Sequence, residues 1–165
     1  MEIKIRPYQP SDAATVVTII NYYIANSTAL YDYELRTIDQ QETIFAEKLN
    51  KGFPVITATI EDRVVGFGYY SEFRFREAYK FTVEHSVYVM PSEHGKGIGK
   101  VIMENLIELA KSQKLHTMIA VIDSENKSSI SFHELYGFKT VGTIQESGFK
   151  FERWLHSVIM QLMLE

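Results

Sequence analysis

A glycine-rich stretch, VYVMPSEHGKGIGK at residues 87–100, has the composition of an anion-binding loop. Alternating apolar residues end at Val89, the glycines allow a tight turn, and apolar residues then recur at helical spacing from Ile98 onward. Backbone N–H groups at the start of such a helix lack partners and lie at the positive end of its dipole, where Lys96 and Lys100 add charge. The sequence therefore predicts a phosphate site, although glycines at this spacing also form simple tight turns. The candidate ligands are His94, Gly95, Lys96, Gly97, Ile98, Gly99 and Lys100.

Two other phosphate loops do not fit this stretch. A nucleoside-triphosphate P-loop needs a glycine and a Ser or Thr where this chain has His94 and Val101. The dinucleotide fingerprint needs a third glycine where this chain has Lys100 or Ile102. The predicted phosphate loop therefore belongs to another class.

Composition limits the classes of protein to which the chain can belong. It has 165 residues, 45% hydrophobic and 23% charged, which is typical of a soluble globular protein, and we expect one domain over residues 1–165. A net charge of −4 disfavours a nucleic-acid partner. With no cysteine, no signal-like start and no long apolar run, the chain is expected in the cytoplasm, without a membrane partner. His85, His116 and His156 show no metal-ligand spacing, so no metal site is expected.

Periodicity and turn residues predict a mixture of strands and helices. Helices are expected at residues 16–25, with Ser11 as the N-cap, at 38–49, with a capping box of Thr37 and Gln40, and at 98–113 and 128–135. Strands are expected around residues 3–5 and at 54–60, 64–70, 81–89, 118–122, 138–144 and 153–162. This order predicts an α+β fold with one central sheet, partly antiparallel, covered by helices on both faces.

The sequence HGKGIG, which follows a strand and leads into a helix, resembles the pyrophosphate loop of the GNAT acetyltransferase superfamily. That loop reads Gln or Arg, two residues, Gly, one residue, and Gly or Ala, so His94 departs from it at the first position. Three longer segments, FTVEHSVYVMPSEHGKGIG, ENKSSISFHELYGFKTVGT and GFKFERWLHSVIMQ, are similar to the phosphinothricin acetyltransferase family, which includes enzymes acting on methionine sulfoximine and methionine sulfone. The resemblance covers nearly the entire chain. It implies the GNAT fold, whose central mixed, mostly antiparallel sheet is flanked by helices on both faces.

The resemblance implies that the enzyme transfers acetyl from acetyl-CoA to the free α-amino group of a small amino-acid analogue. In that reaction the neutral amine attacks the thioester directly. Members of the family are commonly homodimers, so a homodimer is expected here. The resemblance also implies that a splayed strand end binds acetyl-CoA through its main chain, with the Val89 N–H stabilising the oxyanion. By spacing alone, Asn126 is predicted to be an N-cap in a turn. The matching cofactor residues outside the loop are Val87, Tyr88, Val89, Asn126 and Ser128.

Glu84 and His133 match the family's proposed base and its partner. An α-amino group with a pKa of about 8 must lose a proton before attack, and a carboxylate on a mostly apolar strand is costly without a partner or a function. Strand alternation places Glu84 on the face opposite Val87. Without the family, a salt-bridged Glu84 at a strand edge is an equally good interpretation. His133 stands where many GNAT enzymes have a tyrosine that protonates the leaving thiolate, and Tyr136 is the alternative donor.

Arg74 and Arg76 match the family's basic residues for the acceptor, and arginine can bind a carboxylate in a bidentate manner. Strand alternation would place both on one face, and by pattern alone an exposed strand edge explains them as well. Tyr31 lies in an early aromatic loop that is similar to the family's substrate loop. Late in the chain, Glu152 and His156 replace a Gly and an Asp of the family's pattern. These two differences leave open that the enzyme acetylates a different acceptor.

Three functions stay open on the sequence. The first is acetylation of phosphinothricin, methionine sulfoximine or methionine sulfone. The second is the same chemistry on another amine, such as a protein N-terminus, an antibiotic or a polyamine. The third is a CoA-binding module without catalysis, which His94 in place of Arg supports and which Glu84 and His133 argue against.

Overall fold

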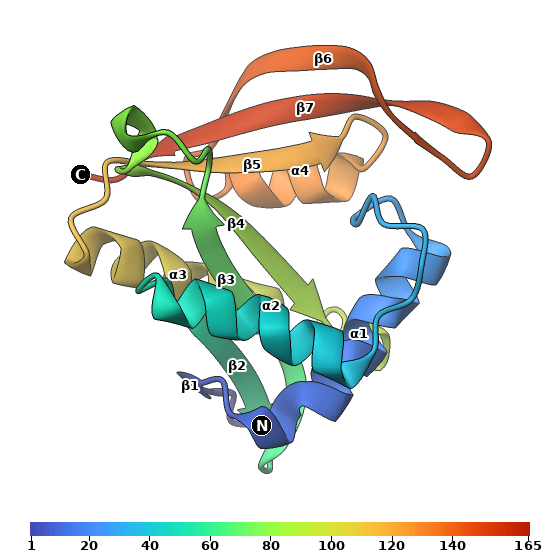
Figure 1. Cartoon of the computed structure of the whole chain (residues 1–165), viewed down its shortest axis with the longest axis vertical. Coiled ribbons are helices and arrows are strands. Elements are labelled where there is room, and N and C mark those ends of the chain that lie inside the picture. The colour runs from blue at the N-terminus through green and yellow to red at the C-terminus, as the bar shows by residue number, and fades with distance from the viewer.

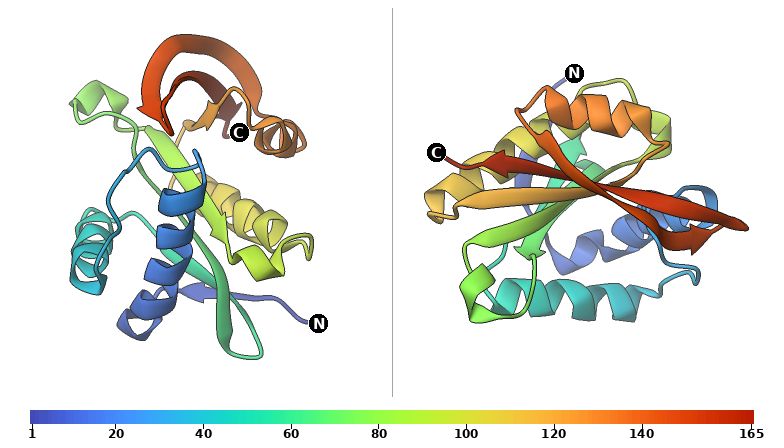
Figure 2. Two further views of the ribbon diagram at one scale, coloured as in Figure 1. Left: turned by 90° about the vertical axis from the view of Figure 1, so that its right-hand side faces the viewer. Right: turned by 90° about the horizontal axis from the view of Figure 1, so that it is seen from above.

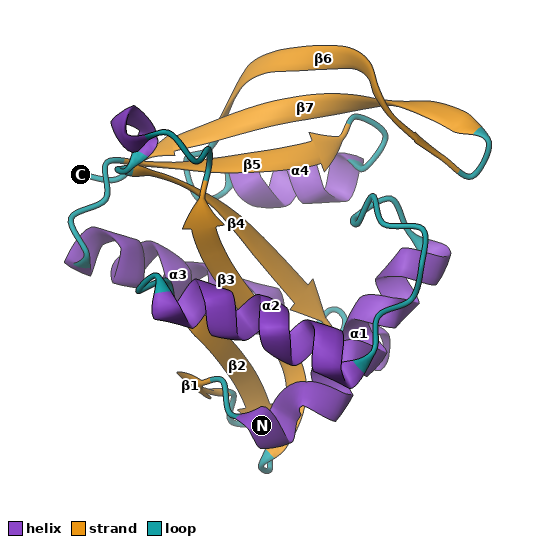
Figure 3. Ribbon diagram, viewed as in Figure 1, coloured by secondary structure: helices purple, strands orange, loops and turns teal.

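The computed structural model describes residues 1–165 as a seven-stranded sheet with four α-helices (Figure 1). The strands are β1 (Lys4–Pro7), β2 (Val55–Ile60), β3 (Arg63–Glu72), β4 (Thr82–Val89), β5 (Thr117–Asp123), β6 (Lys139–Lys150) and β7 (Arg153–Met163). The helices are α1 (Ala13–Asn26), α2 (Ile38–Asn50), α3 (Ile98–Ser112) and α4 (Lys127–Glu134). Short 3-10 turns at Pro10–Asp12, Glu77–Tyr79 and Pro91–Glu93 lie in the connections between these elements. Figure 3 distinguishes helices, strands and loops by colour.

The sheet has the order β1-β2-β3-β4-β5-β7-β6, and only the β4–β5 pair is parallel. The predicted α+β fold with a mixed, mostly antiparallel sheet is therefore confirmed. Consecutive strands β2, β3 and β4 pair antiparallel in order and form the predicted meander. A two-residue turn joins β2 to β3, and residues 73–81 join β3 to β4. β7 lies between β5 and β6, so the last hairpin extends the sheet beyond β5.

Helices cover both faces of the sheet, as predicted (Figure 2). On one face, Ile20 of α1 and Phe45 of α2 are buried with Phe67 and Tyr88 from the sheet. On the other face, α3 buries Ile102 in a larger cluster, against which α4 also packs. Full burial of each such side chain contributes about 1.5–3 kcal/mol, so these clusters hold the helices against the sheet.

β4 and β5 diverge near the middle of the sheet, as Figure 1 shows. Their register ends at Glu84 opposite Ile119. Beyond that point β4 stays paired with β3 as far as Val89, and β5 stays paired with β7 as far as Asp123. The second half of β4 therefore has one edge without a neighbouring strand.

Capping signals were correct for α2 and wrong for α1. The Thr37–Gln40 capping box is present: Gln40 N–H donates to Thr37 Oγ1 at 3.2 Å, and Thr37 N–H donates to Gln40 Oε1 at 2.9 Å. Ser11 is not the N-cap of α1, because it lies inside a 3-10 turn and Asp12 occupies the cap position. Asp12 pairs instead with Arg6 at 2.7 Å, which ties the start of α1 to β1.

The last hairpin is longer than predicted. The strand expected at residues 138–144 continues to Lys150, with two register shifts along its length. Nearly all of β6 is exposed, so no apolar alternation marks its full extent. The turn to β7 consists of Phe151 and Glu152, both with positive φ angles of 53° and 59°.

Candidate active site

The predicted phosphate loop is a turn that opens α3. Gly95 and Gly97 both have a φ of 80°, and Gly97 is the N-cap of the helix. A Cβ added to either glycine would meet nothing within 4 Å, so space lies open in front of the loop. The left-handed backbone explains why glycine stands there, and the open space allows an anion to approach the free N–H groups of the first turn.

A cavity of about 650 Å³ lies between the diverging strands, with walls from β4, the glycine loop, β5 and α4. It brings together every residue predicted to bind acetyl-CoA except Lys96, whose Nζ lies 2.5 Å from Glu93 Oε2. Asn126 lines the cavity and is also the N-cap of α4, accepting from the Ser129 N–H at 3.2 Å. The predicted residues in the lining are Val87, Tyr88, Val89, His94, Gly95, Gly97, Ile98, Gly99, Lys100, Asn126 and Ser128.

The free edge of β4 presents main-chain groups to this cavity. Met90 N–H donates to Val65 O on β3 at 2.8 Å, so the N–H and C=O of Val89, one residue earlier, point away from β3. The Tyr23 hydroxyl donates to Val89 O at 2.7 Å from that side. The Val89 N–H is then a free donor, and alternation turns the main chain of Val87 to the same edge. An extended amide-containing ligand can pair with such an edge as a further strand would.

Tyr23 on α1 links this edge to the glycine loop. Its hydroxyl lies 2.8 Å from His94 Nε2 as well as 2.7 Å from Val89 O. Burial raises the pKa of Tyr23 to about 12, so the hydroxyl keeps its proton at neutral pH and donates it to the carbonyl. His94 Nε2 must therefore carry a hydrogen and donate to Tyr23. No sequence pattern predicts this contact, because only the fold brings these distant residues together.

His133 on α4 forms a buried pair with His85 on β4, which the sequence did not predict. Their Nε2 atoms are 2.9 Å apart, and His133 Nδ1 lies 2.6 Å from Ser129 O. A carbonyl only accepts, so His133 Nδ1 carries a hydrogen, its Nε2 accepts, and His85 Nε2 donates. His85 Nδ1 is buried without a partner. Burial lowers the pKa of His85 to about 3, and the charge of His133 lowers it by a smaller amount. Burial also lowers the pKa of His133.

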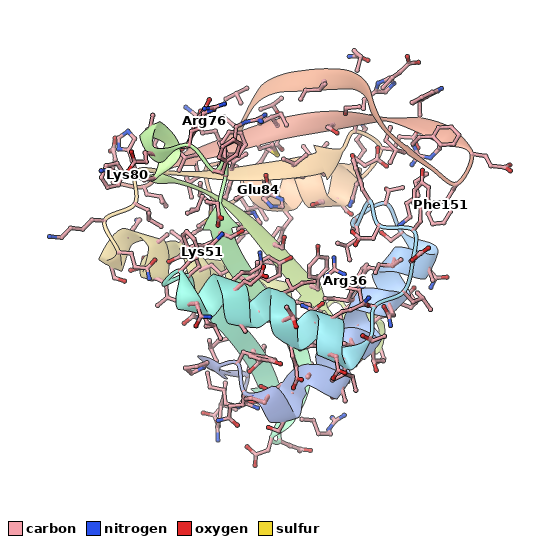
Figure 4. The ribbon with its side chains drawn as sticks, in the orientation of Figure 1. Arg36, Lys51, Arg76, Lys80, Glu84 and Phe151 are labelled. Atoms are coloured by element: carbon pink, nitrogen blue, oxygen red, sulfur yellow. The ribbon has the colours of Figure 1, made fainter.

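Glu84 lies on the other face of β4, at the residue where pairing with β5 ends. Because neighbouring strand residues alternate and His85 faces His133, the two predicted catalytic residues Glu84 and His133 lie on opposite faces. Burial raises the pKa of Glu84, and the charges of Lys48 and Arg74 partly offset that rise. Glu84 forms no ion pair, so the salt-bridged alternative is not observed. Glu84 is half-buried, and Figure 4 shows it near the middle of the view.

A second cavity, of about 810 Å³, lies between α2 and the end of β3. Ser71 lines it and is the register partner of Glu84, so the cavity adjoins the strand pair that carries the carboxylate. Arg74 and Arg76 also line it. The prediction that these arginines share a strand face is wrong, because β3 ends at Glu72 and both lie exposed in the following connection.

Tyr31, predicted to contact the acceptor, lines neither of these two cavities. Its hydroxyl lies 3.1 Å from Ser157 Oγ on β7, and its ring packs against Gly148 on β6. Lys150 Nζ donates to the carbonyls of Ser27 and Leu30, which fixes the start of the same loop. The aromatic loop is therefore attached to the last hairpin through its side chains.

The arrangement combines a turn for a pyrophosphate, a free strand edge for an extended amide chain, and a half-buried carboxylate beside a basic cavity. No three His, Cys, Asp or Glu side chains are grouped so that they could hold a metal ion. None of the helices has both the length and the apolar character needed to cross a membrane.

The sequence model of the acetyltransferase (GNAT) family matches residues 18–138. This chain belongs to the GNAT acetyltransferase family.

Relatives and solved structures agree with this assignment. The L-methionine sulfoximine/L-methionine sulfone acetyltransferase of Pseudomonas aeruginosa is 35% identical over 166 residues, which cover 100% of this chain and 96% of the relative. An L-amino acid N-acyltransferase of Escherichia coli is 31% identical, with 99% of this chain and 95% of the relative covered. The structure of a phosphinothricin acetyltransferase from Sinorhizobium meliloti, solved with acetyl-CoA, matches with a TM-score of 0.96 at 33% identity. The match covers 99% of this chain and 89% of the Sinorhizobium meliloti chain.

The enzyme is therefore an acetyl-CoA-dependent N-acetyltransferase with the GNAT fold. The resemblance to phosphinothricin and methionine sulfoximine acetyltransferases, which three longer segments of the sequence carry, is confirmed. Acetyl-CoA also suits the residues of this site: the loop offers unpaired N–H groups, and the edge of β4 offers the Val89 N–H.

Proposed function

We propose that this acetyltransferase acts on the free α-amino group of a small amino-acid analogue of the phosphinothricin, methionine sulfoximine or methionine sulfone type. Relatives with those names match nearly the whole chain. The observation that carries the proposal is the position of Glu84, a partly buried carboxylate that adjoins a cavity lined with basic side chains. The basic cavity suits the acceptor's carboxylate, and Glu84 suits its amine.

Glu84 is the proposed base. An α-amino group with a pKa of about 8 is largely protonated at neutral pH, and it must lose a proton before it can attack a thioester. Burial raises the pKa of Glu84 toward that of the amine, which makes the proton transfer less unfavourable. The Val89 N–H faces the gap and is free to stabilise the negative charge that develops on the acyl oxygen.

Tyr136 is the proposed donor of the proton that the leaving thiolate takes up. Tyr136 and His133 both line the cofactor cavity. In neutral His133 the single ring hydrogen is committed to Ser129 O, while Nε2 accepts from His85. Burial raises the pKa of Tyr136, so its hydroxyl keeps its proton until the thiolate forms. The thiolate proton is therefore assigned to Tyr136 and the amine proton to Glu84.

Residues 1–165 are proposed to form one domain that assembles as a homodimer in the cytoplasm. The last hairpin exposes apolar side chains, among them Val141, Ile144, Phe149 and Trp154. Apolar surface of this kind favours association with a second copy. Light scattering of the purified protein tests the assembly: a particle of about twice 19.1 kDa supports it, and a monomer at micromolar concentration contradicts it.

Continuous detection of the thiol released from acetyl-CoA tests the proposed acceptor. The acceptors are phosphinothricin, methionine sulfoximine, methionine sulfone, unmodified amino acids, polyamines, an aminoglycoside and short peptides with a free N-terminus. Turnover with the first three and not with the others is expected. Turnover confined to a polyamine, antibiotic or peptide would assign a different amine. Acetyl-CoA binding without turnover of any acceptor would contradict the proposal.

A further inference from the structure

Lys48 on α2 carries a positive charge that the proposed chemistry does not use. Its Nζ lies 3.3 Å from Ser71 Oγ and 4.8 Å from the centre of the Tyr69 ring. No carboxylate lies within 4.0 Å of it. An ammonium group has three N–H donors, of which Ser71 takes one. A partly buried cation with unused donors is costly, so an anion bound beside it would be stabilised.

Lys51, the C-cap residue of α2, lines the same cavity but already has a partner. Its Nζ lies 2.6 Å from Glu72 Oε1, and its side chain is exposed. The two lysines therefore differ in the property that matters for a ligand: Lys51 forms an ion pair and Lys48 does not, although the charges of Glu72 and Glu84 act on Lys48 from a longer distance. Lys51 is the matched control for Lys48.

The cavity as a whole is positively charged. Four cationic and two acidic side chains line it, in a chain whose net charge is −4. Without the pair of Lys51 and Glu72, three cations remain with one acid. The local charge is thus opposite in sign to that of the whole chain, which favours an anionic ligand.

Lys48 also lies close to the proposed base. Ser71, which accepts its hydrogen bond, is the register partner of Glu84. Lys48 and Arg74 are the two cations whose charges act on Glu84. Lys48 belongs to α2 and Arg74 to the connection after β3, so two separate cationic groups lie near one carboxylate. That arrangement suits an acceptor with two anionic groups and one amine.

We propose that Lys48 is a specificity-determining residue that binds an anionic group of the acceptor, so that the enzyme prefers α-amino acids carrying a second anion. The inference rests on the function proposed above. One anionic group pairs with Lys48, the other pairs with Arg74 and Arg76, and the amine lies at Glu84. Phosphinothricin has this chemistry, because it carries a carboxylate and a phosphinate. Methionine sulfone carries one carboxylate and a neutral sulfone, so it lacks the second anion.

Steady-state kinetics of the full-length enzyme with these two acceptors test the proposal in Lys48→Met and in the control Lys51→Met. Methionine keeps the length and packing of the lysine stem and removes the charge. Lys48→Met is expected to raise KM for phosphinothricin about 10- to 100-fold, the effect of losing one charge-assisted hydrogen bond. In Lys48→Met, the KM for methionine sulfone should change less than about threefold. In Lys51→Met, the KM values for phosphinothricin and for methionine sulfone should both change less than about threefold. Lys48→Arg should keep the preference.

An equal rise in KM for both acceptors would overturn the proposal, and so would no rise for either. A shift of the acidic limb of the pH–rate profile in Lys48→Met without a selective rise in KM for phosphinothricin would show that the lysine acts only through Glu84 and would overturn the proposal. If the Met variant unfolds, Lys48→Gln provides a second neutral side chain for the same comparison. Failure of the unmodified enzyme to acetylate either acceptor would contradict the proposed function, and this inference with it.

Discussion

His85→Gln tests the buried histidine pair through the pH dependence of stability. Burial beside His133 lowers the pKa of His85 from 6.5 to about 3. In the unfolded chain the same imidazole lies in water and takes up a proton as the pH falls below 6.5. Between these two values the unfolded state binds the extra proton, so the free energy of unfolding falls as the pH falls.

The loss can be worked out at pH 5. At about 1.4 kcal/mol per pH unit, the interval from 6.5 to 5 corresponds to a loss of about 2 kcal/mol. This value depends only on the unfolded-state pKa, because the folded-state pKa lies well below 5. Glutamine at position 85 offers an amide N–H to His133 Nε2 without a titrating group, so it removes this pH dependence and keeps the hydrogen bond.

Urea unfolding followed by circular dichroism at pH 7 and pH 5 measures the effect. The unmodified enzyme is expected to lose about 2 kcal/mol more than His85→Gln between the two pH values. Because His133 and the carboxylates titrate in both proteins, the difference isolates His85. Equal losses in the two proteins would refute the buried, neutral His85 and the tautomers derived from it.

Three further substitutions test other parts of the structure. Gly97→Val is expected to abolish acetyl-CoA binding in titration calorimetry, because a φ of 80° strains a β-branched residue and its side chain would occupy the space in front of the loop. Unchanged affinity would contradict the loop as the pyrophosphate site. Glu152→Gly should raise the free energy of unfolding by about 1 kcal/mol, and the melting temperature by roughly 2–4 °C, because a positive φ favours glycine. A lower melting temperature would show that the Glu152 side chain stabilises the turn. Thr37→Ala should lower the free energy of unfolding by about 1 kcal/mol through loss of the Oγ1 acceptor, and an unchanged urea midpoint would show that water replaces the cap.

The fold followed from the sequence wherever local periodicity reports burial. Strands β2, β3, β4 and β5 are buried and bounded by turn residues, and each lies close to its predicted range. β6 is almost wholly exposed, so its pattern ended at residue 144 although the strand continues to Lys150. Ser11 failed as a cap because a 3-10 turn, which has no distinctive periodicity, precedes α1.

From residue patterns alone, without the family resemblance, the site was predictable only where its residues are consecutive. The glycine loop was found because it is one continuous stretch, whereas the free edge from Val87 to Val89 and the cavity residues Asn126 and Ser128 came from the family resemblance. The contacts of Tyr23 with His94, and of His85 with His133, join residues far apart in the sequence, and no spacing rule connects them. Arg74 and Arg76 were expected to share a strand face because they alternate with aromatic residues, but β3 ends at Glu72 and both arginines lie in the connection that follows.

The pH dependence of kcat/KM in the unmodified enzyme and in Glu84→Gln, with phosphinothricin as the acceptor, tests the central claim most directly. If Glu84 takes the amine's proton, Glu84→Gln should lower kcat by about 10²- to 10⁴-fold at neutral pH, while acetyl-CoA binding stays unchanged. The unmodified enzyme should gain activity as the pH rises through the raised pKa of Glu84, and the variant should lack that step. Full activity of Glu84→Gln at neutral pH would contradict the account.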